Sequence, residues 1–247
     1  MQKARKRAVV CLSGGMDSCV CAALAARDFE VYALHCGYGQ RTEERELQSA
    51  RAVADALGSR DFLHLRLDLF RRIGGSALTD ERIAVPEVSE NSAIGASIPV
   101  TYVPFRNAHF LSAAVSWAEV LGVSAVFIGA VEQDSSGYPD CRPAYYEAFQ
   151  RLIETGTKDG DIRIHTPLIH MHKKDIVALG LELAAPLELT WSCYSGSDAA
   201  CGVCESCVLR LRAFEQAGVR DPIRYVSRED AGAELQEHTA VRSNREE

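Results

Sequence analysis

The residues from Ser13 to Ser18 combine side chains and spacing that suit phosphate binding. The run Ser-Gly-Gly-Met-Asp-Ser follows an apolar stretch at residues 8–12 that is typical of a buried strand, and it leads into a helical pattern. The glycines can point successive backbone N–H groups into one concavity, and a helix start adds further unpaired N–H groups and its dipole. The stretch predicts an ATP-binding anion cradle made of Leu12, Ser13, Gly14, Gly15, Met16, Asp17 and Ser18.

Three side chains of this cradle suit particular tasks. The hydroxyls of Ser13 and Ser18 are donors for phosphate oxygens, and the carboxylate of Asp17 suits a Mg²⁺ ion that accompanies the phosphates. The alternative is an ordinary strand-to-helix turn capped by Asp or Ser. The run has neither the Gly-Lys-Ser/Thr ending of a Walker loop nor the Gly-x-Gly-x-x-Gly of dinucleotide binders, so neither of those sites is supported.

Four cysteines near the C-terminus have the spacing of metal ligands. Cys193, Cys201, Cys204 and Cys207 form Cys-x7-Cys-x2-Cys-x2-Cys. Four thiolates close the coordination shell of a tetrahedral ion, which predicts a structural zinc site without an open position for catalysis. An iron–sulfur cluster and unconnected free thiols are the alternatives.

The other cysteines favour different interpretations. Cys11, Cys19 and Cys21 lie in apolar strand or helix patterns and are expected to be small core residues. Cys36 is expected in the loop after the second strand. Cys141 lies in a polar loop near the predicted pocket, where packing is the main interpretation and a catalytic thiol is the alternative.

Composition bounds the class of protein. The 247 residues are 47% hydrophobic, enough for a large core, and the net charge is −7 from 27 basic and 34 acidic residues. This acidic balance argues against a broad nucleic-acid surface and favours small-molecule substrates. No apolar run approaches the ~20 residues of a membrane span, and the N-terminus has no signal-peptide pattern. We therefore expect a cytoplasmic protein with reduced thiols and no membrane partner.

Strands and helices are expected to alternate along most of the chain. Strand patterns precede a helix in each unit, which predicts a parallel sheet with helical crossovers. No sustained period occurs at residues 70–103, where we expect an irregular excursion. The expected strands lie at residues 8–12, 31–35, 62–67, 125–129 and 162–164, and the expected helices at 17–26, 43–57, 110–121, 145–153, 173–183 and around 209–214.

Loops that follow the strands should meet at one edge of such a sheet. A ligand of an open parallel sheet lies beyond the carboxyl ends of its strands. The loops at residues 13–18, 35–41 and 129–140 would all reach that edge. The sequence thus predicts a pocket built by three separate loops.

The cradle resembles a known superfamily. Ser13-Gly14-Gly15-Met16-Asp17-Ser18 is similar to the pyrophosphatase loop of the N-type ATP pyrophosphatases, which cleave ATP between its α and β phosphates to adenylate an acceptor oxygen. The resemblance implies an α/β fold with a doubly wound parallel sheet of the adenine nucleotide alpha hydrolase type. The superfamily includes GMP, NAD and asparagine synthetases and several tRNA-modifying enzymes, and the loop alone does not choose among them.

Three further stretches narrow the resemblance. The stretch from Asp134 to Arg142, Ser-Gly-Tyr-Pro-Asp-Cys-Arg included, together with Tyr38-Gly39-Gln40-Arg41 and the four cysteines, resembles the 7-cyano-7-deazaguanine synthase family of the queuosine pathway. The resemblance runs from Val9 to about Arg212. The usual Val-Pro-Gly-Arg-Asn of the family stands here as Val-Pro-Phe-Arg-Asn, with Phe105 at the glycine position.

The resemblance implies an ATP-dependent carbon–nitrogen ligase. Its substrates would be 7-carboxy-7-deazaguanine, ammonia and ATP, and its product 7-cyano-7-deazaguanine, formed through an adenylated carboxylate and then an adenylated amide. Mg²⁺ and a structural Zn²⁺ are the implied metals, and a homodimer is the implied assembly. The implied organisation is a nucleotide-binding domain at residues 1–185, a zinc-binding segment at 186–227 and a charged tail at 228–247.

The resemblance also implies roles for single residues. Asp17, Lys173 and Arg106 are the expected catalytic residues, with a solvated surface lysine or arginine as the alternative for the last two. The deazaguanine or its carboxylate would be bound by Asp134, Tyr138, Asp140 and Arg142, for which an Asp-Pro turn is the alternative.

Two other functions stay open at this point. The alternative enzyme is a tRNA-modifying ATP pyrophosphatase, a thiolase or a lysidine-type synthetase, against which the acidic balance counts. A nucleotide-binding regulator is the alternative outside catalysis, although the loop keeps both glycines, both hydroxyls and Asp17.

Overall fold

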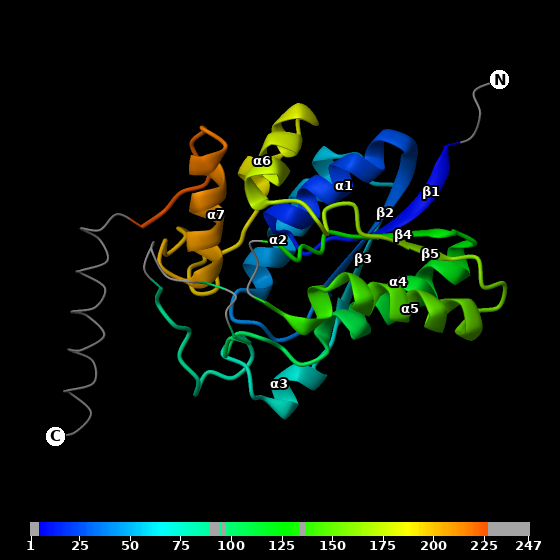
Figure 1. The fold of residues 1–247 in the computed structure, drawn as a ribbon, viewed down its shortest axis with the longest axis horizontal. Helices are drawn as coiled ribbons and strands as arrows, with labels where there is room; N and C mark the ends of the chain where they lie inside the picture. Colours follow the sequence, from blue (N-terminus) through cyan, green and yellow to red (C-terminus); the bar gives the residue numbers. More distant parts are fainter. Residues whose placement is uncertain (1–4, 89–93, 95–96, 134–136, 227–247) are drawn as a thin grey trace.

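The fold is built on a parallel sheet, which Figure 1 shows in the computed structural model of the chain. The structure describes residues 5–88, 94, 97–133 and 137–226. In these residues the strand order is β3-β2-β1-β4-β5, and every pairing is parallel. The strands are β1 (Lys6–Cys11), β2 (Phe29–Gly37), β3 (Asp61–Arg66), β4 (Ala125–Ile128) and β5 (Arg163–His165).

Helices cover both faces of this sheet. α1, α2 and α6 pack on one face, and α4 and α5 on the other (Figure 1). The helices are α1 (Met16–Asp28), α2 (Glu43–Ala56), α3 (Leu69–Ile73), α4 (Arg106–Leu121), α5 (Pro143–Gly156), α6 (Lys173–Glu182) and α7 (Glu205–Gln216), with short 3-10 helices at Pro139–Cys141 and Leu187–Leu189. The predicted doubly wound α/β sheet is confirmed.

Strand β1 shows why the sheet needs two layers of helices. Ala8 and Val10 pack into the core under α1 and α2, whereas Val9 and Cys11 point to the opposite face, under α4. All four side chains are buried. A strand that is apolar on both faces has to be covered on both, which explains its continuous apolar run.

Several element boundaries differ from the expectations. β2 extends to Gly37, so Cys36 lies in the strand, and its prediction as a loop residue was wrong. α4 begins at Arg106, earlier than the apolar spacing indicates. The irregular stretch opens with α3, whose Phe70 is buried against the ring of Tyr38 at a centroid distance of 6.1 Å. Five residues carry too little periodicity to be recognised, and this tertiary contact stabilises the turn.

Phe105 occupies a backbone conformation that favours glycine. Its φ is +59°, in the left-handed region, and it is the N-cap of α4. An L residue with a bulky side chain is uncommon there, whereas glycine adopts this conformation at no steric cost. The ring of Phe105 is 58% exposed and makes edge contacts with His109 and Tyr145. Phe105 therefore makes this turn in a conformation that glycine would adopt without strain.

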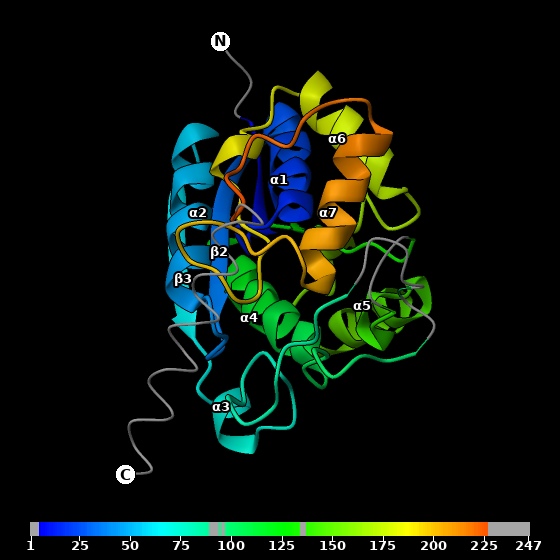
Figure 2. The same ribbon diagram turned by 90° about the vertical axis from the view of Figure 1, so that its left-hand side faces the viewer.

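The C-terminal segment packs onto the main domain. Phe214 of α7 belongs to the same core as α1 and α6. Arg210 is buried, forms an ion pair with Asp221 at 2.7 Å (Nε to Oδ2) and donates to Thr190 Oγ1 at 2.7 Å. Figure 2 shows α7 beside α6. The same hydrophobic core extends to both sides of the domain boundary expected between residues 185 and 186. That boundary stays a prediction.

The two remaining expectations concern the C-terminal tail and membrane-spanning helices. The tail at 228–247 lies outside the described residues. In the described part of the chain, no helix combines the length and the apolar character that a membrane crossing requires.

Candidate active site

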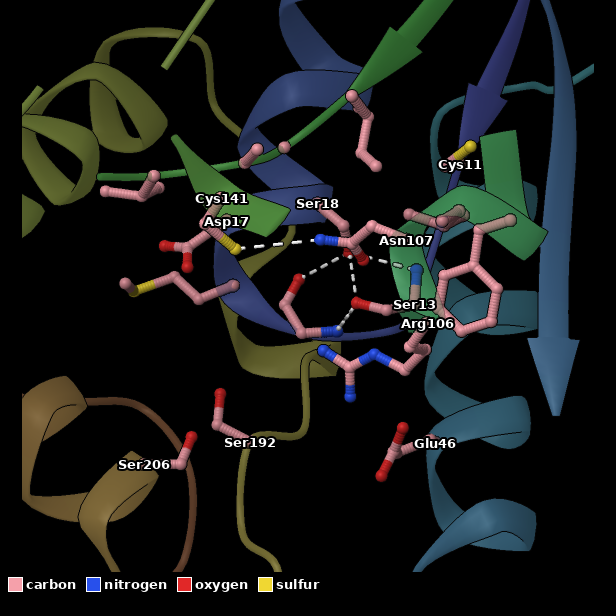
Figure 3. Close-up of a pocket in the computed structure, with 18 of the residues that line it drawn as sticks. Cys11, Ser13, Asp17, Ser18, Glu46, Arg106, Asn107, Cys141, Ser192 and Ser206 are labelled. Atoms are coloured by element: carbon pink, nitrogen blue, oxygen red, sulfur yellow. Dashed lines mark hydrogen bonds between the residues drawn. The ribbon is translucent and has the colours of Figure 1, made fainter. Parts of the chain in front are cut away.

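A pocket of about 280 Å³ opens where β1, β2 and β4 end. The order of the sheet reverses between β1 and β4, which is where ligands bind in open α/β folds. Each of the three expected loops contributes to its lining, for example through Ser13, Tyr38 and Tyr138. Of the predicted cradle, the lining includes Leu12, Ser13, Gly15, Met16, Asp17 and Ser18. Figure 3 shows how 18 of the lining side chains lie around it.

The loop from Ser13 to Ser18 is held by its own hydroxyl groups. Ser18 Oγ donates to the carbonyl of Gly15 at 2.9 Å and accepts from the Ser13 hydroxyl at 3.0 Å. Ser13 Oγ in turn accepts from the N–H of Gly15 at 3.2 Å. The two serines thus shape the loop, in addition to their predicted role as phosphate donors.

Helix α1 starts directly behind this loop. Gly15 is its N-cap, and Met16, Asp17 and Ser18 form its first turn, where no earlier helical carbonyl can accept from their N–H groups. Gly14 has a φ of +90°, which lets the chain turn between strand and helix. The carbonyl of Gly14 accepts from the N–H of Trp191 at 2.8 Å. The arrangement presents backbone donors and a positive helix end to the pocket, as an anion site requires.

Gly129 allows the end of β4 to approach this loop. A Cβ atom at this position would lie 2.7 Å from the carbonyl oxygen of Asp17 and 2.9 Å from the Cα of Ser18. Because both atoms belong to the backbone of α1, they cannot move aside as a side chain would. A residue without a side chain is therefore needed here, and the strand end becomes a wall of the pocket.

Asp17 and Lys173 form an ion pair in the lining of the pocket. Lys173 Nζ donates to Asp17 Oδ2 at 2.7 Å, and the side chains are only 12% and 26% exposed. Lys173 is the first residue of α6, so two elements far apart in sequence bring this pair together. Asp17 Oδ1 is buried without a hydrogen-bond partner among the described residues. Within that part of the chain this oxygen has no partner to balance its charge, and a carboxylate oxygen is the ligand type that Mg²⁺ prefers.

Arg106 enters the same pocket from the start of α4. Its Nη1 donates to the hydroxyl of Tyr38 at 2.8 Å, and its guanidinium lies 5.0 Å from the centroid of that ring. The rings of Phe110 and Tyr138 lie within 6 Å of it as well. Aromatic rings and the Tyr38 hydroxyl hold the guanidinium, and the N–H donors that Tyr38 does not use can bind an anionic ligand.

The four residues expected to bind substrate are placed differently from one another. Tyr138 lines the pocket, whereas Asp140 and Arg142 do not belong to its lining. Asp140 is buried and accepts from the backbone N–H of Asn107 at 3.0 Å, and Arg142 is exposed at the N-cap of α5. Asp134 lies outside the described residues. The predicted contacts of these residues with substrate stay predictions.

Cys141 lines the pocket beside Asn107. The amide Nδ2 of Asn107 donates to Cys141 Sγ at 3.6 Å. Burial, with a further contribution from Asp140, raises the pKa of the Cys141 thiol to about 11. Because the thiolate is the nucleophilic form, this pKa favours the packing interpretation over a catalytic thiol.

Glu46 is a pocket residue that the sequence analysis missed. It lies on α2, it lines the pocket, and its carboxylate accepts from Gln40 Nε2 at 2.9 Å and from Thr42 Oγ1 at 2.8 Å. In the sequence it belongs to a run of charged residues at the start of an amphipathic helix, where a solvated side chain is the expected interpretation. Its location next to the loop, with the backbone oxygen of Glu46 facing Gly14, comes only from the fold.

The four C-terminal cysteines come together as predicted. The sulfur atoms of Cys193, Cys201, Cys204 and Cys207 all lie within 4.8 Å of one another, as ligands of one ion do. Backbone N–H groups of Gly196 and Cys201 donate to Cys193 Sγ at 3.1 and 3.3 Å. Hydrogen bonds from the other three thiols, opposed by burial, hold the pKa of Cys193 well below its usual value. The donor set fits a metal that binds thiolates.

His35 fixes the strand end that carries the loop. Its Nδ1 lies 2.9 Å from the carbonyl oxygen of Leu12, so Nδ1 bears the proton, and its Nε2 is buried without a partner among the described residues. Burial lowers the pKa of His35 to about 4, with smaller contributions from His64 and Arg51 that also lower it and one from the Leu12 hydrogen bond that raises it. The neutral imidazole of His35 therefore holds Leu12, the residue that precedes Ser13, through its carbonyl oxygen.

Stability is expected to fall in mild acid because of His35. An unfolded histidine takes up a proton near pH 6.5, whereas the folded one does so only near pH 4, so acid favours the unfolded chain between these values. The free energy of unfolding should fall by about 3 kcal/mol over this range from His35 alone. Urea unfolding at several pH values from 7 to 4 measures this decrease in the free energy of unfolding. The decrease should be smaller in His35→Gln than in the wild type. The exposed His170→Gln is the control, and an identical pH dependence in wild type and His35→Gln would contradict this assignment.

Comparisons with known proteins identify the family. The family model described as queuosine biosynthesis protein QueC matches residues 7–218. The chain belongs to the QueC family. A 7-cyano-7-deazaguanine synthase from Acidobacterium capsulatum is 74% identical over 92% of this chain and 100% of its own length. One from Koribacter versatilis is 62% identical, over 90% of this chain and 94% of its own.

More distant proteins match as well. A 7-cyano-7-deazaguanine synthase from Chlorobium phaeobacteroides is 56% identical over 91% of this chain and 99% of its own length. Among solved structures, an NH3-dependent NAD synthetase from Campylobacter jejuni covers 76% of this chain and 68% of its own, with 18% identity and a TM-score of 0.44. The family match confirms the resemblance to the queuosine pathway enzymes and decides against the tRNA thiolase and lysidine alternatives.

Proposed function

We propose that this protein is an ATP-dependent ligase that converts 7-carboxy-7-deazaguanine and ammonia to 7-cyano-7-deazaguanine. The observation that carries the proposal is the loop from Ser13 to Ser18 at the end of β1, which lines a pocket together with the start of α1 and with Lys173, the ion-pair partner of Asp17. The printed names of the relatives in the QueC family supply the substrate class.

The reaction needs two activations of the same carbon. A carboxylate is a poor electrophile because oxide is a poor leaving group. Attack of a carboxylate oxygen on the α-phosphorus of ATP releases pyrophosphate and gives an acyl adenylate. Ammonia then forms the C–N bond as AMP leaves and one proton is lost, which yields the amide. The amide oxygen is adenylated in the same way by a second ATP. The loss of AMP and of the two remaining N–H protons then gives the nitrile.

The residues of the pocket have separable tasks in this scheme. The N–H groups of the first turn of α1 hold the phosphates of ATP. Lys173 balances negative charge as pyrophosphate departs, and Arg106 orients an anionic group of the substrate or of AMP. Asp17 would hold Mg²⁺ through its unpartnered Oδ1, and this ion supplies charge neutralisation at the phosphates when bound.

The zinc-binding segment has a structural task in this proposal. Four thiolates leave no open coordination position, so the site fixes the shape of residues 193–207 and takes no part in the chemistry. Ser192, Tyr194 and Ser206, which border the cysteines, line the pocket. We also propose that the protein acts as a cytoplasmic homodimer, as the family resemblance implies.

A product assay tests the proposed function. Purified protein with 7-carboxy-7-deazaguanine, ammonium and Mg·ATP should form two AMP and two pyrophosphate for each nitrile, with mass detection of the amide and the nitrile. Omission of ammonium should stop the reaction before the amide. Release of ADP and phosphate would contradict the proposal, and so would tight ATP binding without any AMP release in the presence of substrate.

A further inference from the structure

Glu46 is a pocket carboxylate to which the reaction scheme assigns no task. Among the described residues that line the pocket, the carboxylates belong to Asp17 and Glu46. Asp17 accepts from Lys173 at the loop. In Figure 3 the two carboxylates lie on opposite sides of the view, with the guanidinium of Arg106 between them. The Asp17 carboxylate thus lies beside Lys173, and in this view the Glu46 carboxylate offers a hydrogen-bond acceptor on the other side of Arg106.

Two fixed donors set the orientation of the Glu46 carboxylate. The backbone N–H of Tyr38 donates to Gln40 Oε1 at 2.8 Å, which turns Gln40 Nε2 toward Glu46 Oε2 at 2.9 Å. Thr42 Oγ1 donates to Glu46 Oε1 at 2.8 Å. Each carboxylate oxygen has two lone pairs, so each can accept one more hydrogen bond from a ligand. The carboxylate is therefore a preorganised fork with two acceptor positions.

The surroundings of this fork suit a flat ring. Aromatic side chains supply much of the apolar lining of the pocket, and they come from separate elements. These are Tyr38, Phe110, Tyr138, Trp191 and Tyr194. Such walls favour a planar heterocycle over a small tetrahedral ion such as ammonium, which would gain nothing from them.

Burial removes the Glu46 carboxylate from hydrogen-bond donors that water would supply. Burial raises the pKa of Glu46 to about 7, and the hydrogen bonds from Thr42 and Gln40 together with the charge of Arg106 lower it against that effect. Glu43 adds a small contribution that raises the pKa. A desolvated carboxylate that gains N–H donors from a ligand recovers interactions it has lost from water.

We propose that Glu46 determines specificity for the deazaguanine ring by accepting hydrogen bonds from its adjacent N1–H and 2-amino groups. This inference rests on the proposed function and assigns recognition of the substrate ring to Glu46. Guanine-type rings present two parallel N–H donors on this edge, which adenine and hypoxanthine rings do not. The 7-carboxyl group lies at the other end of the bicycle, so an edge bound at Glu46 directs that carboxyl toward the loop at Ser13, where the α-phosphate of ATP would be.

Binding of two nitriles tests this proposal without turnover. Titration calorimetry compares 7-cyano-7-deazaguanine with its 2-deamino analogue, 7-cyano-7-deazahypoxanthine, on the full chain. We expect the wild type to bind the 2-amino compound about 10- to 100-fold more tightly, the range for a hydrogen bond to a buried charged group. The preference should weaken as the pH falls below about 7, where the carboxylate becomes protonated.

Glu46→Gln should remove this preference. Its amide oxygen has to face Gln40, so its NH2 group faces Thr42 and the pocket, where it opposes the donors of the ring. Glu44→Gln makes the same change two residues away on the exposed side of α2 and should keep the wild-type preference. Thermal unfolding of both variants checks that the fold is intact.

Two results would overturn the assignment of Glu46 while leaving the proposed function in place. One is an active wild type whose 2-amino preference persists in Glu46→Gln. The other is a variant with normal nitrile binding but a selectively raised KM for ammonium, which would assign the residue to ammonia delivery. A wild type that neither binds these compounds nor releases AMP would instead refute the proposed function itself.

Discussion

Replacing Asp17 by asparagine is expected to lower kcat for AMP release by about 10²- to 10³-fold, the scale of a lost electrostatic contact in a transition state. The carboxylate accepts from Lys173 Nζ at 2.7 Å and leaves its other oxygen for a cation. An amide keeps the size of the side chain but has no charge for either partner. Steady-state measurement of AMP release with saturating substrates gives kcat, and titration of Mg²⁺ in the same assay shows whether its apparent affinity falls.

Two further variants separate the roles of Asp17. Asp28→Asn changes an exposed residue at the far end of α1 and should leave turnover unchanged. If Asp17 acts only by positioning Lys173, the double variant Asp17→Asn/Lys173→Met should be no slower than Lys173→Met alone. Turnover of Asp17→Asn equal to that of wild type would refute the assignment of Asp17 and weaken that of the whole loop.

Loss of one cysteine ligand is expected to have the largest effect on stability. Cys207 lies in the first turn of α7 and is completely buried, with its sulfur close to those of the other three cysteines. Cys207→Ser should reduce bound metal from one ion per chain to a small fraction and lower the free energy of unfolding by several kcal/mol, since structural zinc binding contributes directly to folding. Metal analysis by mass spectrometry and urea unfolding measure the two effects.

The consequence for the pocket is also testable with this variant. Because Ser192, Tyr194 and Ser206 neighbour the cysteines and line the pocket, loss of the metal should impair ligand binding as well. Cys21→Ala, which changes a buried cysteine of α1, is the control and should retain the metal. Full metal occupancy and unchanged stability of Cys207→Ser would contradict the proposed site. If the purified protein is brown and contains iron, the four cysteines hold an iron–sulfur cluster and not zinc.

The site depends on more contacts than its motif alone provides. Arg210, which is buried and paired with Asp221, donates to Thr190 and to Ser192 Oγ at 3.3 Å. These contacts connect α7 to the strand-like segment that lies against the Ser13 to Ser18 loop through the Trp191 N–H. The C-terminal segment therefore positions one wall of the pocket, even though it contributes no group to the proposed chemistry.

The sequence by itself determined the parts of this protein that depend on local pattern. The continuous apolar runs of the strands, the Ser-Gly-Gly-Met-Asp-Ser loop and the spacing of the four cysteines each have a physical meaning within a short window. They predicted the doubly wound sheet and the cysteine cluster correctly, and their combination pointed to the right family. Short elements such as α3 were missed because five residues carry no usable period.

Only the tertiary structure decided which side chains share the pocket. Asp17 and Lys173 are 156 residues apart and form an ion pair because α1 and α6 pack on the same face of the sheet. Glu46 is one of several acidic residues at the start of α2, and only the packing of that helix against the loop turns it toward the pocket. Asp140, which the family resemblance assigns to substrate, accepts a hydrogen bond from the backbone N–H of Asn107 at the start of α4, a contact that the sequence did not indicate. The spacing of apolar residues along the chain predicts helices and strands. Which side chains contact one another depends on how those helices and strands pack in the tertiary structure.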